Sequence, residues 1–202
     1  MTIILDGTNG INTPGLTDTA AASVATTLTV TGAATAASLQ VGGVTTNVYP
    51  LVPSTSVAST SGTSIDFINI PSWVRRITVM ISGVGTSTST VPRVQLGTAS
   101  SIEVTGYTGS NISNSSVSNL STGFPFRDTW ATTNRSYGTF TLTLLDVASN
   151  TWNCTAALGL SDLTNVTTIA GSKALAGTLT RLRLYVDGTA TFTAGLVNIF
   201  WE

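Results

Sequence analysis

The residues best suited to binding chemistry lie in one long polar segment, residues 106–137. Its sequence, GYTGSNISNSSVSNLSTGFPFRDTWATTNRSY, mixes Asn and Ser with aromatic and Arg residues. Aromatic rings stack on sugar rings, and amide, carboxylate and guanidinium groups form directed hydrogen bonds with hydroxyl groups. A segment of this length without regular structure is uncommon in a compact domain and is often functional. Its composition predicts carbohydrate contact as one possible role.

The candidate glycan-binding residues share side chains that stack or form hydrogen bonds. They are Tyr107, Asn111, Trp130, Asn134 and Arg135, with Phe124, Arg127, Asp128 and Tyr137 beside them. The alternative is structural, in which the aromatic side chains cover the end of a core and the Asn and Ser residues face solvent. The sequence favours this structural alternative and leaves the binding role open.

Residues for catalysis are scarce. Histidine is absent, which removes the commonest general base and the commonest metal ligand. Glycoside hydrolysis needs two facing carboxylates, and no Asp/Glu pair stands out in the sequence. A Ser–His system is impossible, and no Gly-rich phosphate loop follows a strand. We expect a non-enzymatic protein without catalytic residues, cofactor or metal, and a polysaccharide-cleaving enzyme is the least favoured alternative.

The single cysteine, Cys154, excludes an intrachain disulfide and is expected to fill a core position. The N-terminus lacks a basic region followed by an apolar run, so no signal peptide is predicted. No apolar run approaches the roughly 20 residues of a membrane span, and we expect no membrane insertion.

The chain is also poor in charge. Of 202 residues only 8% are charged, against about a quarter in ordinary soluble domains. A net charge of −1 gives no electrostatic case for binding nucleic acid. Low charge with abundant Thr and Val suits either a surface buried in an oligomer or a chemically inert surface.

Residues 1 to about 48 differ from the rest, because Asp6 and Asp18 are their only charged residues. Residues 1–15, MTIILDGTNGINTPG, place Ile3, Ile4 and Leu5 before Asp-Gly and Asn-Gly turns. Such a segment has too little apolar surface to fold alone, so it is either disordered or ordered against a partner.

Residues 16–52 contain a short repeat, in which Leu28, Val30 and Gly32 recur as Leu39, Val41 and Gly43. Two short strands of this kind bury their Leu and Val side chains only against neighbours, as solenoid repeats do. The favoured interpretation is an extended β stem of three chains, and the alternatives are an Ala-rich helix at residues 19–25 or a flexible linker.

Residues 53–202 are expected to form the head domain. Residues 64–83, SIDFINIPSWVRRITVMISG, predict one strand up to Ile70 and a second from Trp73 to Ser82, because apolar residues alternate around a proline corner. Similar alternation recurs in residues 138–147 and 178–187. About eight or nine strands without helical periodicity predict an all-β fold, an antiparallel β-sandwich of jelly-roll type.

The stretches SIDFINIPSWVRRITVMISGV and AGLVNIFWE resemble the C-terminal domain of bacteriophage tail and virion-surface proteins, and the opening MTIILDGTNGINTPG resembles the start of such chains. The resemblance implies a structural protein on the virion surface, made in the host cytoplasm and forming a small homotrimeric fibre or knob. Residues 1–15 would then anchor it to other virion proteins of the capsid or tail. Capsid decoration and tail fibre stay open, and the competing function is a host-glycan-binding module for adsorption.

Overall fold

The computed structural model describes residues 39–41, 44–46, 51–113, 116–161 and 166–202. The chain divides into two units, Met1–Val48 and Tyr49–Glu202. The predicted anchor residues Ile3, Ile4 and Leu5 lie outside the described residues, as do Leu28 and Val30 of the predicted stem.

In the first unit, β1 (Leu39–Val41) pairs with β2 (Val44–Thr46) in antiparallel register, with Val41 opposite Val44. The predicted stem residues Leu39 and Val41 are therefore strand residues. A two-stranded hairpin is at best marginally stable alone in water, because it buries few side chains.

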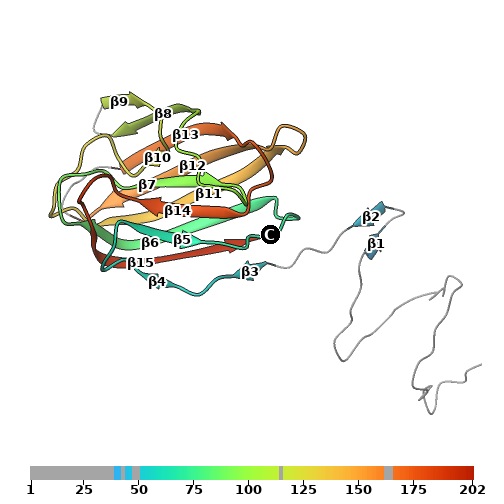
Figure 1. The fold of residues 1–202 in the computed structure, drawn as a ribbon, viewed down its shortest axis with the longest axis horizontal. Helices are drawn as coiled ribbons and strands as arrows, with labels where there is room; N and C mark the ends of the chain where they lie inside the picture. Colours follow the sequence, from blue (N-terminus) through green and yellow to red (C-terminus); the bar gives the residue numbers. More distant parts are fainter. Residues whose placement is uncertain (1–38, 42–43, 47–50, 114–115, 162–165) are drawn as a thin grey trace, which may run out of the picture. The chain divides into compact units, whose positions relative to one another are not determined.

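The second unit contains two antiparallel sheets (Figure 1). The small sheet has the order β10-β7-β14-β5, formed by Phe124–Pro125, Arg93–Gly97, Arg181–Tyr185 and Ser64–Phe67. The large sheet has the order β3-β15-β6-β11-β12-β13-β8-β9, and β4 (Val57–Ala58) also pairs with β15. In the order β3 to β9 just given, these strands are Val52–Pro53, Phe192–Trp201, Arg76–Thr86, Ser136–Asp146, Thr151–Leu160, Val166–Ala174, Tyr107–Ser113 and Ser116–Asn119.

The described residues contain no helix, so the all-β prediction is confirmed, and the antiparallel sheets are consistent with a β-sandwich. One buried cluster takes side chains from both sheets. Alternation places Ile77, Val79 and Ile81 of β6 in this core, together with Leu182 and Leu184 of β14. Each such side chain contributes about 1.5–3 kcal/mol when it leaves water. Cys154 also lies in the core, where burial raises the pKa of its thiol.

The first strand of the opening pair is shorter than its sequence pattern predicts, and the second is displaced along the chain and continues to Thr86. The first strand ends at Phe67 and the second begins only at Arg76. Asn69 has a positive φ of 62°, and the N–H of Val74 donates to the carbonyl of Pro71 at 3.1 Å. The backbone therefore turns from Asn69 to Arg75, where the apolar pattern alone indicates extended chain.

The prediction of a long loop at residues 106–137 was wrong in part, because β8, β9 and β10 lie within it. β8 and β9 carry mainly Ser, Asn, Thr and Gly in place of apolar side chains, and β10 is only two residues long. Backbone pairing holds them, with Asn111 of β8 opposite Ile169 of β13, and their sequence lacks the apolar alternation that indicates a strand.

Replacing Phe140 by Ala tests the core. The ring is fully buried and lies 5.3 Å from the ring of Phe126, so we expect Phe140→Ala to lower the free energy of unfolding by about 3–5 kcal/mol. The control is Thr139→Ala, because the neighbouring Thr139 is exposed and should cost about 1 kcal/mol or less. Denaturant unfolding measures both, and equal losses would contradict this core.

Candidate functional site

Tyr107, the first glycan-binding candidate in the polar segment, is buried in the core. Tyr107 is only 3% exposed, and its ring packs edge-on against Phe124 with 5.1 Å between centroids. Its hydroxyl accepts from the N–H of Leu96 at 2.7 Å and donates to the carbonyl of Glu103 at 2.9 Å. Burial raises the pKa of this hydroxyl. Tyr107 therefore has no free face for a sugar ring.

The predicted residues Asn111, Trp130 and Asn134 are buried as well. Asn111 donates to the carbonyl of Ser118 at 3.1 Å and accepts from the N–H of Asp128 at 3.2 Å. The Trp130 ring packs against Phe126 with 6.3 Å between centroids. The side-chain oxygen of Asn134 accepts from the N–H of Ala131 at 2.7 Å, which closes a turn. These side chains stabilise the fold and present no glycan surface in this structure.

Arg135, the fifth predicted residue, is half-buried and binds backbone carbonyl groups. Its Nη1 donates to Thr132 at 3.0 Å and to Asn134 at 2.8 Å. The guanidinium group also lies against Gly85, where a Cβ would come within 2.6 Å of Nη1. Arg135 thus fixes the turn before β11 onto β6.

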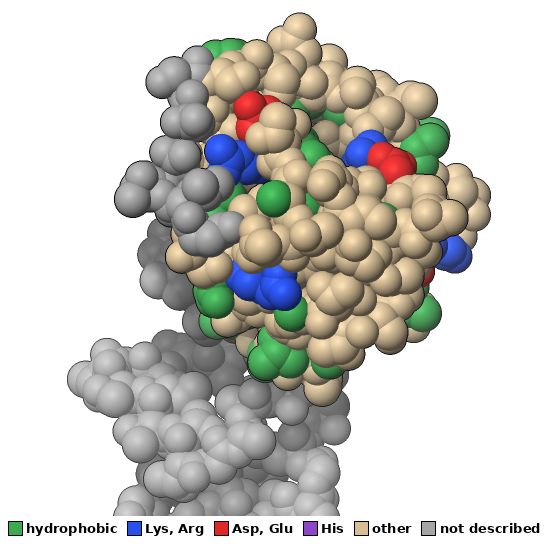
Figure 2. Space-filling model, turned by 90° about the vertical axis from the view of Figure 1, so that its left-hand side faces the viewer, with side chains coloured by type: hydrophobic (Ala, Val, Ile, Leu, Met, Phe, Trp, Pro, Cys, Tyr) green, Lys and Arg blue, Asp and Glu red, His purple; other side chains and the backbone are tan. Residues whose placement is uncertain are grey.

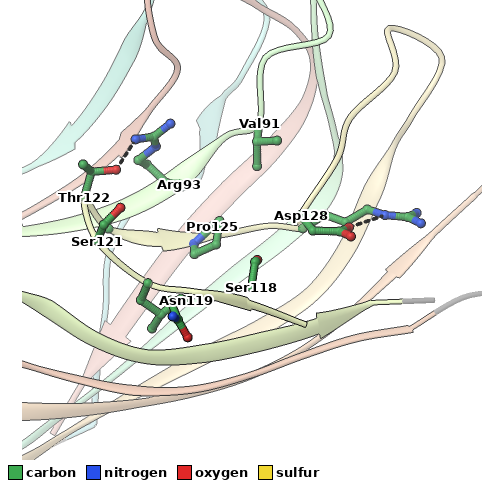
Figure 3. Close-up of a pocket in the computed structure, with 11 residues that line it drawn as sticks. Val91, Arg93, Ser118, Asn119, Ser121, Thr122, Pro125 and Asp128 are labelled. Carbon is green, nitrogen blue, oxygen red and sulfur yellow. Dashed lines mark hydrogen bonds and ion pairs between the residues drawn. The ribbon is translucent and has the colours of Figure 1, made fainter. Parts of the chain in front are cut away.

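The same polar segment nevertheless lines a cleft of about 220 Å³ beside β7 and β9 (Figure 3). Arg93 and Thr122 lie on one side of it, Asp128 lies on the other, and Ser118 and Asn119 come from β9. The remaining lining residues are Val91, Leu120, Ser121, Gly123, Pro125 and Arg127. Gly123 has a backbone conformation with φ 157°, and a Cβ there would lie 2.9 Å from the carbonyl oxygen of Val94. Its small size lets the loop approach β7.

Arg93 is held in position by groups on two sides. It forms an ion pair with Asp187 and donates to the hydroxyl of Thr122. The Thr122 carbonyl accepts from the side-chain amide of Gln95 at 2.7 Å, so the 120–123 loop is tied to β7. The cation is therefore fixed at the rim, with its charge balanced by Asp187.

Asp128 is the carboxylate of the cleft and is 12% exposed. Desolvation raises the pKa of Asp128, but hydrogen bonds from the hydroxyl groups of Ser113 and Ser116 and from backbone N–H groups outweigh it and hold the pKa below its usual value. The N–H of Thr129 donates to the carboxylate at 2.9 Å, and the Nε of Arg127 lies 3.4 Å from it. Asp128 therefore stays ionised at neutral pH.

Two guanidinium nitrogens beside the cleft lack a hydrogen-bond partner among the described residues, the Nη1 of Arg127 and the Nε of Arg93. Both nitrogens are buried, so a ligand reaches them only if neighbouring side chains move. Hydroxyl, amide, guanidinium and carboxylate groups together suit a neutral polyhydroxyl ligand. The cleft is smaller than the about 300 Å³ at which typical ligand pockets begin, so it has room for about one sugar ring.

The polar segment lines this cleft mainly through residues that the sequence pattern does not single out. Arg93, Ser118, Asn119 and Thr122 line the cleft but were not predicted. Ser118, Asn119 and Thr122 are ordinary polar residues in a Ser- and Asn-rich run, and Arg93 lies outside the segment. No sequence signal separates them from their solvent-exposed neighbours.

No group of three His, Cys, Asp or Glu side chains that could hold a metal ion occurs in the described part of the chain. None of its described elements is a helix long and apolar enough to cross a membrane. Comparisons of the chain with known protein families, with curated proteins and with solved structures found no match.

Asp128→Asn tests the electrostatics of the cleft. The variant should be less stable than the wild type at pH 7, because the surrounding donors bind a carboxylate more strongly than an amide. Since the folded-state pKa lies below the ordinary value of about 3.9, the wild-type advantage is complete above that value and disappears as the pH falls through the folded-state pKa. The measurement is the free energy of unfolding of the wild type and of Asp128→Asn at pH values from 7 to 2, and the quantity compared is the difference between the two proteins.

The control for this experiment is Ser121→Ala, because Ser121 is exposed at the rim and its loss should change stability little at either pH. An Asp128→Asn variant as stable as the wild type at pH 7 would contradict the stabilised carboxylate.

Proposed function

We propose that this chain is a non-enzymatic structural protein of a bacteriophage virion surface. In this proposal three chains form a small fibre or knob, with residues 1–15 as the anchor to capsid or tail proteins and residues 16–52 as a β stem. The head domain then projects outward, either as a capsid decoration or as a tail fibre involved in host attachment.

The observation that carries the proposal is the resemblance to phage surface proteins in two stretches far apart in the sequence. Their strands, β6 and β15, pair along the large sheet, with Ile77 opposite Trp201 and Ser82 opposite Leu196. The two stretches thus belong to one structural unit. Two stretches that pair in one sheet support a relationship between the head domain and phage surface proteins better than two unconnected stretches would.

The strand order supports a jelly roll with one insertion as the finer fold. In a jelly roll of eight strands, the first, eighth, third and sixth form one sheet, and the second, seventh, fourth and fifth form the other. The small sheet β5-β14-β7-β10 follows the first order, and β6, β13, β8 and β9 follow the second. The hairpin β11-β12 is then inserted between β6 and β13, and β15 extends the sheet beyond β6.

Jelly rolls occur in viral capsid proteins and in lectins, so the architecture suits both the structural function and the glycan-binding alternative. Each carboxylate in the described residues is engaged with a partner. Asp66 pairs with Arg183, Glu103 with Lys173, Asp187 with Arg93 and Glu202 with Arg76, Asp128 accepts from Ser113, and Asp146 accepts from the N–H groups of its own turn. This arrangement favours a structural use of the acids over acid–base catalysis.

The alternative function is host-glycan binding, and the polar cleft is the observation that favours it. The cleft groups Arg93, Asn119, Thr122 and Asp128 around a space for about one sugar ring. In this version the protein still belongs to the virion surface, and the cleft contacts a receptor.

The direct test of the proposal is electron-microscopic localisation of the chain on an intact virus particle. Density at three-fold or quasi-three-fold positions of the capsid would assign a decoration, and density at the tail or baseplate would assign an adsorption fibre. Absence of the chain from purified particles would overturn the proposal.

The oligomeric state gives a second test. We expect sedimentation equilibrium of the full-length protein to give three times the chain mass of 20.7 kDa. Replacing Leu28 and Val30 by Asp should lower this mass, because charged side chains oppose burial between stem strands. Thr29→Asp is the matched control, since alternate strand residues point to opposite faces. A monomeric wild type would exclude the trimer.

The alternative has its own test at the cleft. Asn119→Ala with Ser121→Ala should weaken binding to host-surface polysaccharide about 2–10-fold for each hydrogen bond lost. The melting temperature should stay unchanged, because both residues line the cleft and are exposed. Ser100→Ala is the control, an exposed residue that does not line the cleft. Unchanged binding in the double variant would exclude this cleft as the glycan site.

A further inference from the structure

The outward side chains of the large sheet form rows that cross it from strand to strand. The strand register aligns Leu196, Ser82, Tyr137, Gly159 and Val166 in one row. The next row contains Asn198, Met80, Thr139, Ala157, Thr168, Ile112 and Val117. We call these two rows the apolar belt. Two further rows begin at Phe200 and at Arg76 and consist mainly of Thr, Ser and Asn.

The apolar belt gathers large hydrophobic side chains that are exposed in the single chain. Val117 is 64% exposed and Val166 is 63% exposed, and Leu196, Ile112 and Tyr137 are about half exposed. Ile112 pairs with Val117 and with Thr168, so the belt continues over β9, β8 and β13. Clustered exposed apolar side chains mark interaction surfaces, whereas scattered ones are ordinary.

The outer face of the large sheet is also nearly free of charge. In its four rows the described residues include one charged side chain, Arg76, which forms an ion pair with Glu202. The small sheet differs, because Asp66, Arg93, Arg181 and Arg183 lie on its outer face. On the side of the molecule drawn in Figure 2, the charged side chains form separate spots among uncharged atoms.

The size of the face matches a protein partner. Seven strands at about 4.8 Å spacing span about 29 Å, and four rows span about 20 Å along the strands. The whole outer face, which is the two rows of the belt together with the two polar rows, covers about 600 Å² and is close to the about 800 Å² per partner of a standard protein interface. Depletion of charge together with exposed apolar and aromatic side chains is the usual composition of the core of such an interface.

We propose that the apolar belt is a subunit interface that binds the belts of further copies of this chain. The inference rests on the proposed function, since a shared stem would hold the heads together at high effective concentration, so that a modest apolar contact suffices. A neutral face meets its own copy without charge repulsion, and it carries no charge pattern that would select a different partner.

Hydroxyl-radical labelling of the full-length protein tests this inference. Tyr137 lies in the belt and is 45% exposed, whereas Tyr185 is less exposed on the outer face of the small sheet. In a single chain Tyr137 is labelled faster than Tyr185. A belt covered by copies reverses this order, and dilution to the monomer restores it.

The variant Val166→Lys should raise labelling of Tyr137 at least about three-fold at the wild-type concentration. The matched control is Val147→Lys, because Val147 is an equally exposed valine, 61%, in the β11–β12 turn and should leave labelling unchanged. Val117→Lys provides a second belt variant in case Val166→Lys fails to fold, and folding of each is checked by its thermal transition.

The outcomes separate the inference from the proposed function. An oligomeric chain whose Tyr137 is labelled faster than Tyr185 overturns the belt interface and leaves the trimeric fibre standing. A monomeric chain overturns both. Protection of Tyr137 that persists at monomer concentrations also overturns the inference, because another segment of the same chain would then cover the belt.

Discussion

The pairing of β6 with β11 on one side and β15 on the other is the constraint on which the rest of the second unit, Tyr49–Glu202, depends. These three long strands set the register of the large sheet and place Ile77, Val79 and Ile81 against the small sheet. They also join the two ends of the domain, because β6 comes early in it and β15 ends at Trp201. The register of these strands also determines which outward side chains lie together in each row of the outer face.

The low charge of the chain has a clear structural counterpart. Ion pairs hold strands and loops in position, as Arg183 does with Asp66 between β14 and β5, and as Lys173 does with Glu103, 2.5 Å away. Of the fourteen charged side chains in the described residues, ten take part in an ion pair. A domain of this kind keeps broad uncharged areas, which suits assembly more than attraction of a charged ligand.

The polar segment shows which features of a candidate binding site can be predicted from the sequence. Tyr107 and Trp130 were candidates because aromatic and polar residues occur together, yet both rings are buried. Asn119 and Thr122 lie at the cleft only because the hairpin β8-β9 and the following loop fold back toward Arg93 of β7. Neither the spacing nor the type of these residues predicts that the loop folds back toward β7, because this depends on contacts between segments more than 20 residues apart.

The sequence by itself determined the all-β class and which face of each long strand lies in the core, because a period of two fixes the side-chain direction once a strand exists. It also determined the absence of histidine and the low charge, which restrict the chemistry that the chain can perform. Only the tertiary structure decided which strands are neighbours, that β11 and β12 separate β6 from β13, and that Val166, Ile112 and Val117 meet on one surface. Backbone hydrogen bonds between strands are the same for every sequence, so strand order depends on the packing of the whole core and not on any local pattern.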